Sequence, residues 1–150
     1  MSDDQLFLFA NYAVLPAWML LAVAPRWAWT QRLVHSLLYP VLLGAAYTLG
    51  FLAAGSFSAG GESEAGVGSL AAVSAAFANP RTLLVGWVHY LCFDLFVGAW
   101  EARDAQRRGV PHWQLVPCLF LTLMAGPMGL LLYLGFRWMR ARSTSLGEAA

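Results

Sequence analysis

The chain has 150 residues, of which 59% are hydrophobic and 11% are charged, and its net charge is +1. Soluble domains are about 45–50% apolar and about 25% charged, and a domain of this size cannot bury so much apolar surface in one core. The composition therefore predicts an integral membrane protein, and the near-neutral charge excludes an electrostatic nucleic-acid binder. The length suits one domain, which we place at residues 1–142, followed by a disordered tail at 143–150.

The first predicted transmembrane helix is Gln5–Ala24, because about 20 mainly apolar residues cross a bilayer. Asn11 and Pro16 interrupt this segment, which membrane helices tolerate when neighbouring groups satisfy the backbone. Two aspartates precede it, where a signal peptide would carry basic residues, so it is not read as one. The second predicted transmembrane helix is Leu33–Ala54.

A polar Gly/Ser loop at residues 55–66 ends this first half of the chain. The stretch Val67–Ala78 is too short to span and predicts an interfacial or re-entrant helix. Asn79 is a favourable N-cap for a third transmembrane helix, Pro80–Trp100, and the fourth is Gln114–Phe136. The predicted fold is therefore all-α, with four transmembrane helices and one short interfacial or re-entrant helix.

The nine basic residues are all arginines, a bias typical of GC-rich bacterial genomes, so we expect a multi-pass protein of a bacterial inner membrane. Four spans would place both termini and the Gly/Ser loop on one face. Five arginines would then lie on one side and four on the other, which gives no clear orientation, although the acidic N-terminus favours both termini outside. The five are Arg26, Arg32, Arg103, Arg107 and Arg108, and the four are Arg81, Arg137, Arg140 and Arg142.

Asp94 is the strongest candidate functional residue, because a charged side chain at the centre of a membrane helix costs about 2.5–3.5 kcal/mol. Such a group must face the bundle interior, be protonated or be paired. Helical spacing puts Trp87, Tyr90 and Glu101 on its face. A purely structural role, as a hydrogen bond between helices, would also explain it. Depth along the helices allows three further polar partners: His35, Tyr39 and Thr122.

His89 lies about 140° around the same helix from Asp94, so the two cannot form a same-face pair. It is a candidate proton carrier or ligand contact, and a hydrogen bond to neighbouring backbone is an equal alternative. His35 and His89 differ in depth by about 10 Å, which argues against a shared haem. No clustered metal-ligand spacing and no flavin, nicotinamide or phosphate motif is present, so no metal and no cofactor are expected.

The sequence also predicts a site for a lipophilic ligand between the helices. Gly126 and Pro127 indicate a kink or a close helix approach at mid-depth, which can open a cavity or serve packing alone. Deep aromatic residues could line a slot for a flat, long, apolar molecule, since they lie below the interfacial belts. Lipid is the other expected partner, and a homo-oligomer is compatible with the sequence. The predicted ligand-binding residues are Asn11, Trp87, Tyr90, Phe93, Thr122, Gly126 and Pro127.

The C-terminal half carries three motifs in succession: a Trp-His-Tyr/Asp stretch, a loop with Pro-His-Trp, and a GPxGLLLY block. Together they make the segment Gly86–Phe136 resemble the abscisic-acid-deficient-four-like family. The first motif comprises Trp87, His89, Tyr90, Asp94, Gly98 and Trp100; the second Pro111, His112, Trp113 and Pro117; the third Gly126, Pro127, Gly129 and Tyr133.

This resemblance implies a four-helix membrane fold and a carotenoid-linked role, because plant members are chloroplast membrane proteins required to make neoxanthin. That conversion opens an epoxide and forms an allene without net redox change. It needs an acid at the epoxide oxygen and a base for a carbon-bound proton. The resemblance thus implies a cofactor-free isomerase acting on an epoxycarotenoid or similar substrate, with Asp94 as acid and His89, or His35 with Tyr39, as base.

Two other functional classes remain open at this point. One is a carotenoid- or lipid-binding membrane module without catalysis. The other is a small proton-coupled transporter built around Asp94, which ranks third because the chain has no internal repeats. The residues alone do not separate binding from turnover.

Overall fold

The computed structural model describes residues 1–54, 68–142 and 145, and every regular element in this part of the chain is an α-helix. The predicted all-α class is thereby confirmed. The helices are α1 (Asp3–Val23), α2 (Ala28–Leu33), α3 (Leu38–Ala53), α4 (Leu70–Phe77), α5 (Pro80–Arg108), α6 (His112–Ala125) and α7 (Pro127–Ala141).

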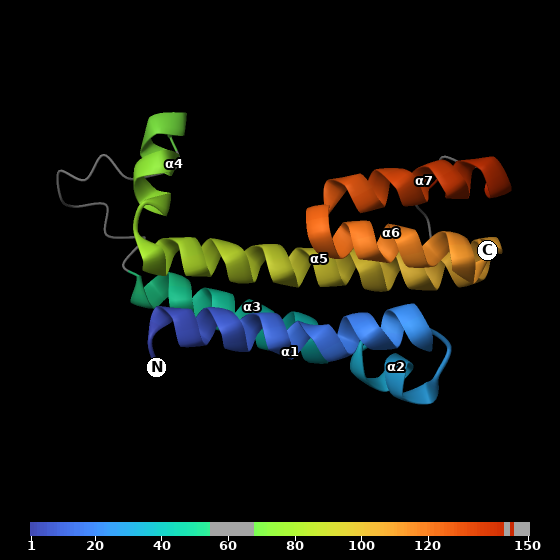
Figure 1. Ribbon diagram of the computed structural model, residues 1–150, viewed down its shortest axis with the longest axis horizontal. Coiled ribbons are helices and arrows are strands. Elements are labelled where there is room, and N and C mark those ends of the chain that lie inside the picture. The colour runs from blue at the N-terminus through green and yellow to red at the C-terminus, as the bar shows by residue number, and fades with distance from the viewer. Residues whose placement is uncertain (55–67, 143–144, 146–150) are drawn as a thin grey trace.

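The 29-residue helix α5 is the central element, with α1 and α3 along one side and α6 and α7 on the opposite side (Figure 1). It begins as predicted, since the Asn79 side chain accepts a hydrogen bond of 2.8 Å from the Arg81 amide. It ends at Gly109, whose φ of 68° is left-handed. At 1.5 Å per residue α5 is about 43 Å long, so its ends extend beyond a hydrocarbon core of about 30 Å.

Helix α3 runs antiparallel to α5. The ring of Tyr47 lies 5.5 Å from that of His89, and a Cβ on Gly50 would lie 3.0 Å from Cγ2 of Val85. The helix begins at Leu38 rather than at the predicted Leu33, because Pro40 lacks an N–H and its ring excludes a helix that runs through residue 36. The proline instead falls in the first turn of α3, where it is tolerated.

Three segments of the described chain are long and apolar enough to cross a membrane: Asp3–Val23, Ala28–Ala53 and Pro80–Arg108. The second comprises α2 and α3 together. The structure thus agrees with membrane integration, but it does not confirm four spans. The short helix expected within Val67–Ala78 is present as α4, and Ser69 caps it by accepting a 3.1 Å hydrogen bond from the Ala72 amide.

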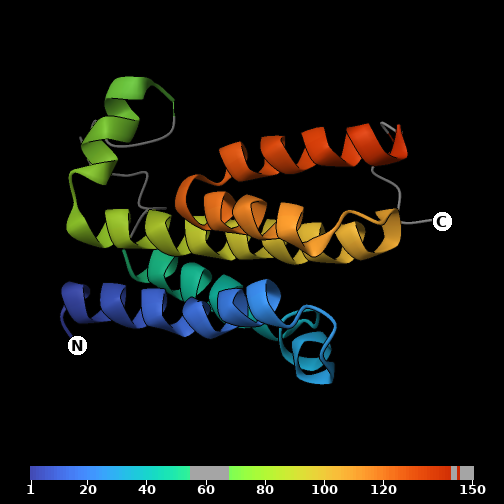
Figure 2. The ribbon, with the colours of Figure 1, turned by 45° about the vertical axis from the view of Figure 1, so that its right-hand side comes forward.

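The predicted continuous fourth helix, Gln114–Phe136, is wrong. Helix α6 ends at Ala125, Gly126 adopts φ 25°, and α7 runs back along α6 as the C-terminal hairpin (Figures 1 and 2). A Cβ on Gly129 would overlap the backbone of Thr122, so the two helices are in very close contact. The expected kink is a full reversal, because Gly126 adopts a positive φ that only glycine readily takes, and Pro127 then fits the first turn of α7, where its missing N–H costs no hydrogen bond.

The reversal also changes where the chain ends. The prediction that both termini share one face is wrong, because Arg137 of α7 lies against Asp104 near the end of α5, whereas the N-terminus lies beside the start of α5 (Figure 1). The predicted Gly/Ser loop at 55–66 and all of the predicted tail except residue 145 lie outside the described residues.

The arginines consequently gather at one end of the helical bundle. Arg26 lies in a cavity wall with Ala105 and His112, and the last two turns of α5 and of α7, with the residue that caps α7, carry six others. Arg81, beside Asp3, is at the opposite end. The end around residue 108 therefore has Arg26, Arg32, Arg103, Arg107, Arg108, Arg137, Arg140 and Arg142.

This asymmetry predicts the orientation in the membrane. Cytoplasmic loops carry the excess of arginine, so we expect the loop at 109–111 and the C-terminus in the cytoplasm and the N-terminus outside. Reporter fusions at residue 60, at residue 110 and at the C-terminus would measure this. The fusion at 60 should report an external location and the other two a cytoplasmic one, whereas agreement between residue 60 and the C-terminus would restore the four-span topology.

Candidate functional site

Asp94 is the central residue of α5, equally far from Pro80 and from Arg108. At 1.5 Å per residue each end is about 21 Å away, so the carboxyl group lies at the middle of the candidate membrane span Pro80–Arg108. Its side chain lies against the reversal of the C-terminal hairpin, since a Cβ on Gly126 would be 2.6 Å from Oδ1 of Asp94. Oδ2 is buried and has no hydrogen-bond partner among the described residues. The structure thus keeps one polar oxygen unsatisfied at this depth.

Aromatic and amide groups extend this site toward α1. The Tyr90 hydroxyl lies within hydrogen-bonding reach of the Asp94 carboxyl, and the ring of Tyr90 is 5.3 Å from the ring of Trp87. The indole Nε1 of Trp87 donates a 3.2 Å hydrogen bond to Oδ1 of Asn11. We call this run, Asn11, Trp87, Tyr90, Asp94 and Gly126, the Asp94 cluster. Five of the residues singled out in the sequence therefore lie together.

His89 and Phe93 lie on a different side of α5. Their rings are 4.6 Å apart, and His89 also contacts the ring of Tyr47 on α3. Phe93 is 57% exposed. Helical rotation explains this separation, since His89 lies about 140° and Phe93 about 100° around the helix from Asp94. Phe93 is therefore not part of the slot formed by Trp87 and Tyr90.

The expected cluster of Asp94 with His35, Tyr39 and Thr122 is not formed. His35 and Tyr39 line a cavity between α3 and α5, where Nδ1 of His35 lies 3.3 Å from NH1 of Arg103. Thr122 lies one turn before Gly126 on α6 but donates to Glu101 instead. Pro127 is the first residue of α7, where it helps to end α6 beside the site.

Glu101 is a second buried acid, two turns beyond Asp94 on the same face of α5. The Thr122 hydroxyl lies 3.0 and 3.1 Å from its two carboxyl oxygens, and both residues are fully buried. A hydroxyl group has one hydrogen to donate, so Thr122 donates to only one of the two carboxyl oxygens at a time. The seven-residue spacing had indicated that Glu101 shares the face of Asp94, but no sequence signal marked Thr122 as its partner.

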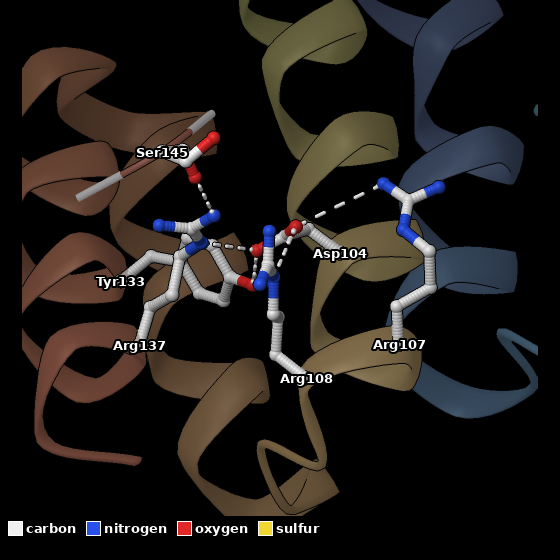
Figure 3. A network of polar contacts seen from close by, with 6 residues as sticks. All are labelled: Asp104, Arg107, Arg108, Tyr133, Arg137 and Ser145. Carbon is white, nitrogen blue, oxygen red and sulfur yellow. Dashed lines mark hydrogen bonds and ion pairs between the residues drawn. The ribbon is translucent and has the colours of Figure 1, made fainter. Parts of the chain in front are cut away.

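Asp104 is the third acid on this side of α5, and it anchors the far end of the hairpin (Figure 3). Its Oδ2 accepts hydrogen bonds from the Tyr133 hydroxyl at 2.7 Å and from Nε of Arg137 at 2.6 Å. Its Oδ1 lies 3.5 Å from Nε of Arg108. Arg137 is only 2% exposed and also donates to the carbonyl of Ser145. A continuous fourth helix would have carried Arg137 to the other face, so the sequence analysis missed this network.

The three acids differ in what they can do chemically. Glu101 and Asp104 are fully buried and contact polar side chains of the hairpin. Asp94 alone among them is half-buried, and its aromatic neighbours lie on the half of α5 that the C-terminal hairpin does not cover. Among the described residues, no group of three or more His, Cys, Asp or Glu side chains is placed to hold a metal. The arrangement can donate or accept a proton beside an apolar molecule.

Gly126→Ala should displace the hairpin from Asp94. A Cβ there would meet Oδ1 at 2.6 Å, and φ 25° strains a non-glycine residue. We expect a loss of about 1–3 kcal/mol of stability, measured as a lower melting temperature in detergent. Gly135→Ala is the control, because nothing lies within 4 Å of its added Cβ and alanine favours a helix. An equal effect of both substitutions would contradict this contact.

Asp104→Asn should loosen the hairpin by leaving Arg137 without a carboxylate. Breaking a buried ion pair by removing one partner costs about 3–5 kcal/mol, and we expect a comparable fall in unfolding free energy in detergent. Asp3→Asn is the control, since the Asp3–Arg81 pair is partly exposed, with side chains 33% and 46% exposed, and should contribute less than about 1 kcal/mol. Similar melting curves for wild type and Asp104→Asn would show that the network does not hold the hairpin.

Comparison with known proteins identifies the family of this chain. A family model described as ABA4-like (ABA DEFICIENT 4-like) matches residues 5–133, which include most of α1, all of α5 and α6, and the whole Asp94 cluster. No curated protein and no solved structure matches the chain. Since the match covers most of the chain and confirms the resemblance found in the C-terminal motifs, the protein belongs to the ABA4-like family.

Proposed function

We propose that this protein is a carotenoid-linked membrane isomerase in which Asp94 exchanges a proton with a lipophilic substrate. The observation that carries the proposal is the Asp94 carboxyl at mid-membrane, with one oxygen unpartnered and aromatic rings beside it. Intramembrane ionisable groups are costly and mark functional sites by default. Membership of the ABA4-like family supports a carotenoid-related role. We place this activity in a bacterial inner membrane.

The chemistry suits a site with one exchangeable acid. Opening an epoxide to an allenic alcohol breaks a C–O bond, removes a proton from the neighbouring chain carbon and adds a proton to the oxygen. No electrons are lost or gained, so no redox partner is needed. A carboxylic acid has two oxygens, so Asp94 can give a proton through one oxygen and take the next through the other. Tyr90 is placed to orient the carboxyl group during both transfers.

This assignment changes the expected base. His89 faces Tyr47 and Phe93, and His35 faces Arg103, so both lie outside the Asp94 cluster. The residues beside the proposed reacting atoms are instead Asp94 and Tyr90. Trp87 and Tyr90 offer adjacent ring surfaces for a flat polyene, and the hydrogen bond from Trp87 to Asn11 fixes the indole.

Asp94→Asn tests the proposal, because asparagine keeps the shape and the hydrogen-bonding ability but has no acidic proton. We expect conversion to be abolished while the protein still folds and binds pigment. The measurement is carotenoid extraction from a pigment-producing host that expresses each variant, with melting curves in detergent alongside. Full product formation by the Asn variant would exclude Asp94 as the acid.

Asp94→Leu distinguishes catalysis from a structural role. If Asp94 only linked helices, asparagine would be nearly neutral, since interhelical hydrogen bonds average about 0.6 kcal/mol. Leucine would be the damaging change, because it would leave the Tyr90 hydroxyl without its partner. Bound pigment in the absence of conversion by the wild-type protein would instead support a carotenoid-binding module without catalysis.

A further inference from the structure

The cavity that has Arg26 in its wall lies where the α1–α2 turn faces the end of α5 and the start of α6. Its volume is about 460 Å³, within the range of about 300–1,000 Å³ that is common for small-molecule sites. None of the residues of the Asp94 cluster lines it. The space is therefore separate from the proposed isomerase site, and that proposal does not use it.

The depth of this cavity follows from its place on α5. Gln106 is in the wall, twelve residues beyond Asp94, so the wall lies about 18 Å from the middle of the candidate span Pro80–Arg108. A hydrocarbon half-core is about 15 Å deep, so a bilayer centred on this span has its headgroups at this level. Trp27 and Val23, also in the wall, are 53% and 72% exposed. The cavity is therefore open both to headgroups and to acyl chains.

The polar side chains of the wall can all donate hydrogen bonds. They are those of Arg26, Trp27, Gln106 and His112, and each carries an N–H group. Among the described residues that line the cavity, none is an aspartate or a glutamate. The wall therefore offers positive charge and donors to a ligand, with no carboxylate to repel an anion.

Backbone carbonyls at the cavity are already engaged by the protein. The carbonyl of Ala24 accepts a hydrogen bond of 2.7 Å from the Thr30 hydroxyl, and the carbonyl of Pro25 accepts one of 3.2 Å from Nε2 of Gln31. Both residues are in the wall. Because these acceptors have their donors, the α1–α2 turn does not call for a ligand that donates.

The donors, in contrast, are not used up. Gln106 gives one amide hydrogen to the carbonyl of Pro25, at 3.4 Å, and keeps a second. The guanidinium of Arg26 makes no hydrogen bond or ion pair with any residue that the structure describes, whereas Arg103 contacts His35 at 3.3 Å. A guanidinium has five N–H groups in a fork that matches the oxygens of a phosphate or a carboxylate.

The field at this end of the bundle also favours an anion. Helix α6 begins at His112 without a side-chain cap, so its free amide groups and the positive end of its dipole lie at the cavity. Eight arginines lie at this end, and the two acids in the same half of α5, Glu101 and Asp104, are fully buried. Such an excess of one charge attracts ligands of the opposite charge.

We propose that this cavity binds the phosphate headgroup of an anionic phospholipid. The guanidinium of Arg26 donates to the phosphate oxygens, and the free amide hydrogen of Gln106 is a further donor in the same wall. The acyl chains leave past Val23 into the bilayer. Basic pockets between membrane helices bind anionic headgroups in this way. The site is independent of Asp94 and of any isomerase activity.

Native mass spectrometry of the full-length protein in mild detergent tests the site. The probes are dioleoylphosphatidylglycerol and dioleoylphosphatidylcholine, which have the same chains and a phosphate but differ in net charge. Phosphatidylglycerol should bind about five-fold more tightly, because choline brings a positive charge to the arginines. Equal affinities would show that only the chains are recognised, and would overturn the proposal.

A pair of arginine substitutions locates the binding. Arg26→Gln should weaken the binding of phosphatidylglycerol about ten-fold, since hydrogen bonds to a charged group are lost. Arg140→Gln is the matched control, because it removes the same charge from the same end but Arg140 is exposed and does not line the cavity. It should change the affinity less than about two-fold. Equal effects would show a general attraction to this end, and would contradict the site.

Two further measurements complete the test. Gln106→Glu places a carboxylate in the wall, which should pair with Arg26 and abolish the preference for phosphatidylglycerol at an unchanged melting temperature. A retained preference would contradict the assigned wall. Millimolar inorganic phosphate should not displace the lipid, because it has no chains; displacement would show that a free anion is the ligand and would overturn the lipid.

Asp94→Asn separates this proposal from the isomerase. The variant should bind phosphatidylglycerol as the wild type does, whatever its effect on carotenoid conversion, because Asp94 does not line the cavity. Loss of lipid binding in Asp94→Asn, with the melting temperature retained, would show that the two sites are not independent.

Discussion

The buried pairing of Asp104 on α5 with Arg137 on α7 is the interaction on which the C-terminal half depends. Both side chains are excluded from solvent, and Tyr133 donates to the same carboxyl oxygen that accepts from Arg137. A buried arginine is tolerated only when it is paired, so the hairpin must lie back along α5 for the chain to fold. With α7 held there, α6 is fixed between α7 and α5, and its end lies beside the middle of α5.

That placement creates the environment of Asp94. The hairpin covers only the second half of α5, so its reversal at Gly126 ends beside the central residue of the helix (Figure 1). Glu101 and Asp104, deeper under the hairpin, contact side chains of α6 and α7, whereas Asp94 lies at the edge of the covered region with one oxygen unpartnered. The difference between Glu101 and Asp104, which contact polar side chains of the hairpin, and Asp94, which has an unpartnered oxygen, thus follows from how far the hairpin reaches along α5.

Helix α5 presents separate polar sites to its neighbours. The side toward the hairpin carries the acids, and the side toward α3 carries His89 and the cavity that His35 and Tyr39 line. His89 points away from Asp94 around α5, and His35 contacts Arg103, so neither histidine contacts the Asp94 carboxyl.

The sequence by itself determined the membrane class, the all-α fold, the helix that begins after Asn79 and the position of an acidic residue, Asp94, far from both ends of that helix. These features depend on local composition, on capping and on the cost of a charge in hydrocarbon, all of which can be read from neighbouring residues. The association of Trp87, Tyr90 and Asp94 followed from helical spacing alone. The motif residues also identified the family.

Only the tertiary structure decided that Gly126 reverses the chain rather than kinks it. An apolar stretch of 23 residues from 114 to 136 satisfies the length of a span either way, so hydrophobicity cannot distinguish a crossing from a hairpin. The choice rests on long-range pairing of Asp104 with Arg137, residues 33 apart in sequence, and on the close contact of Gly129 with Thr122. The same pairing moved three arginines to the other end of the bundle, because it determines on which side of the membrane α7 ends.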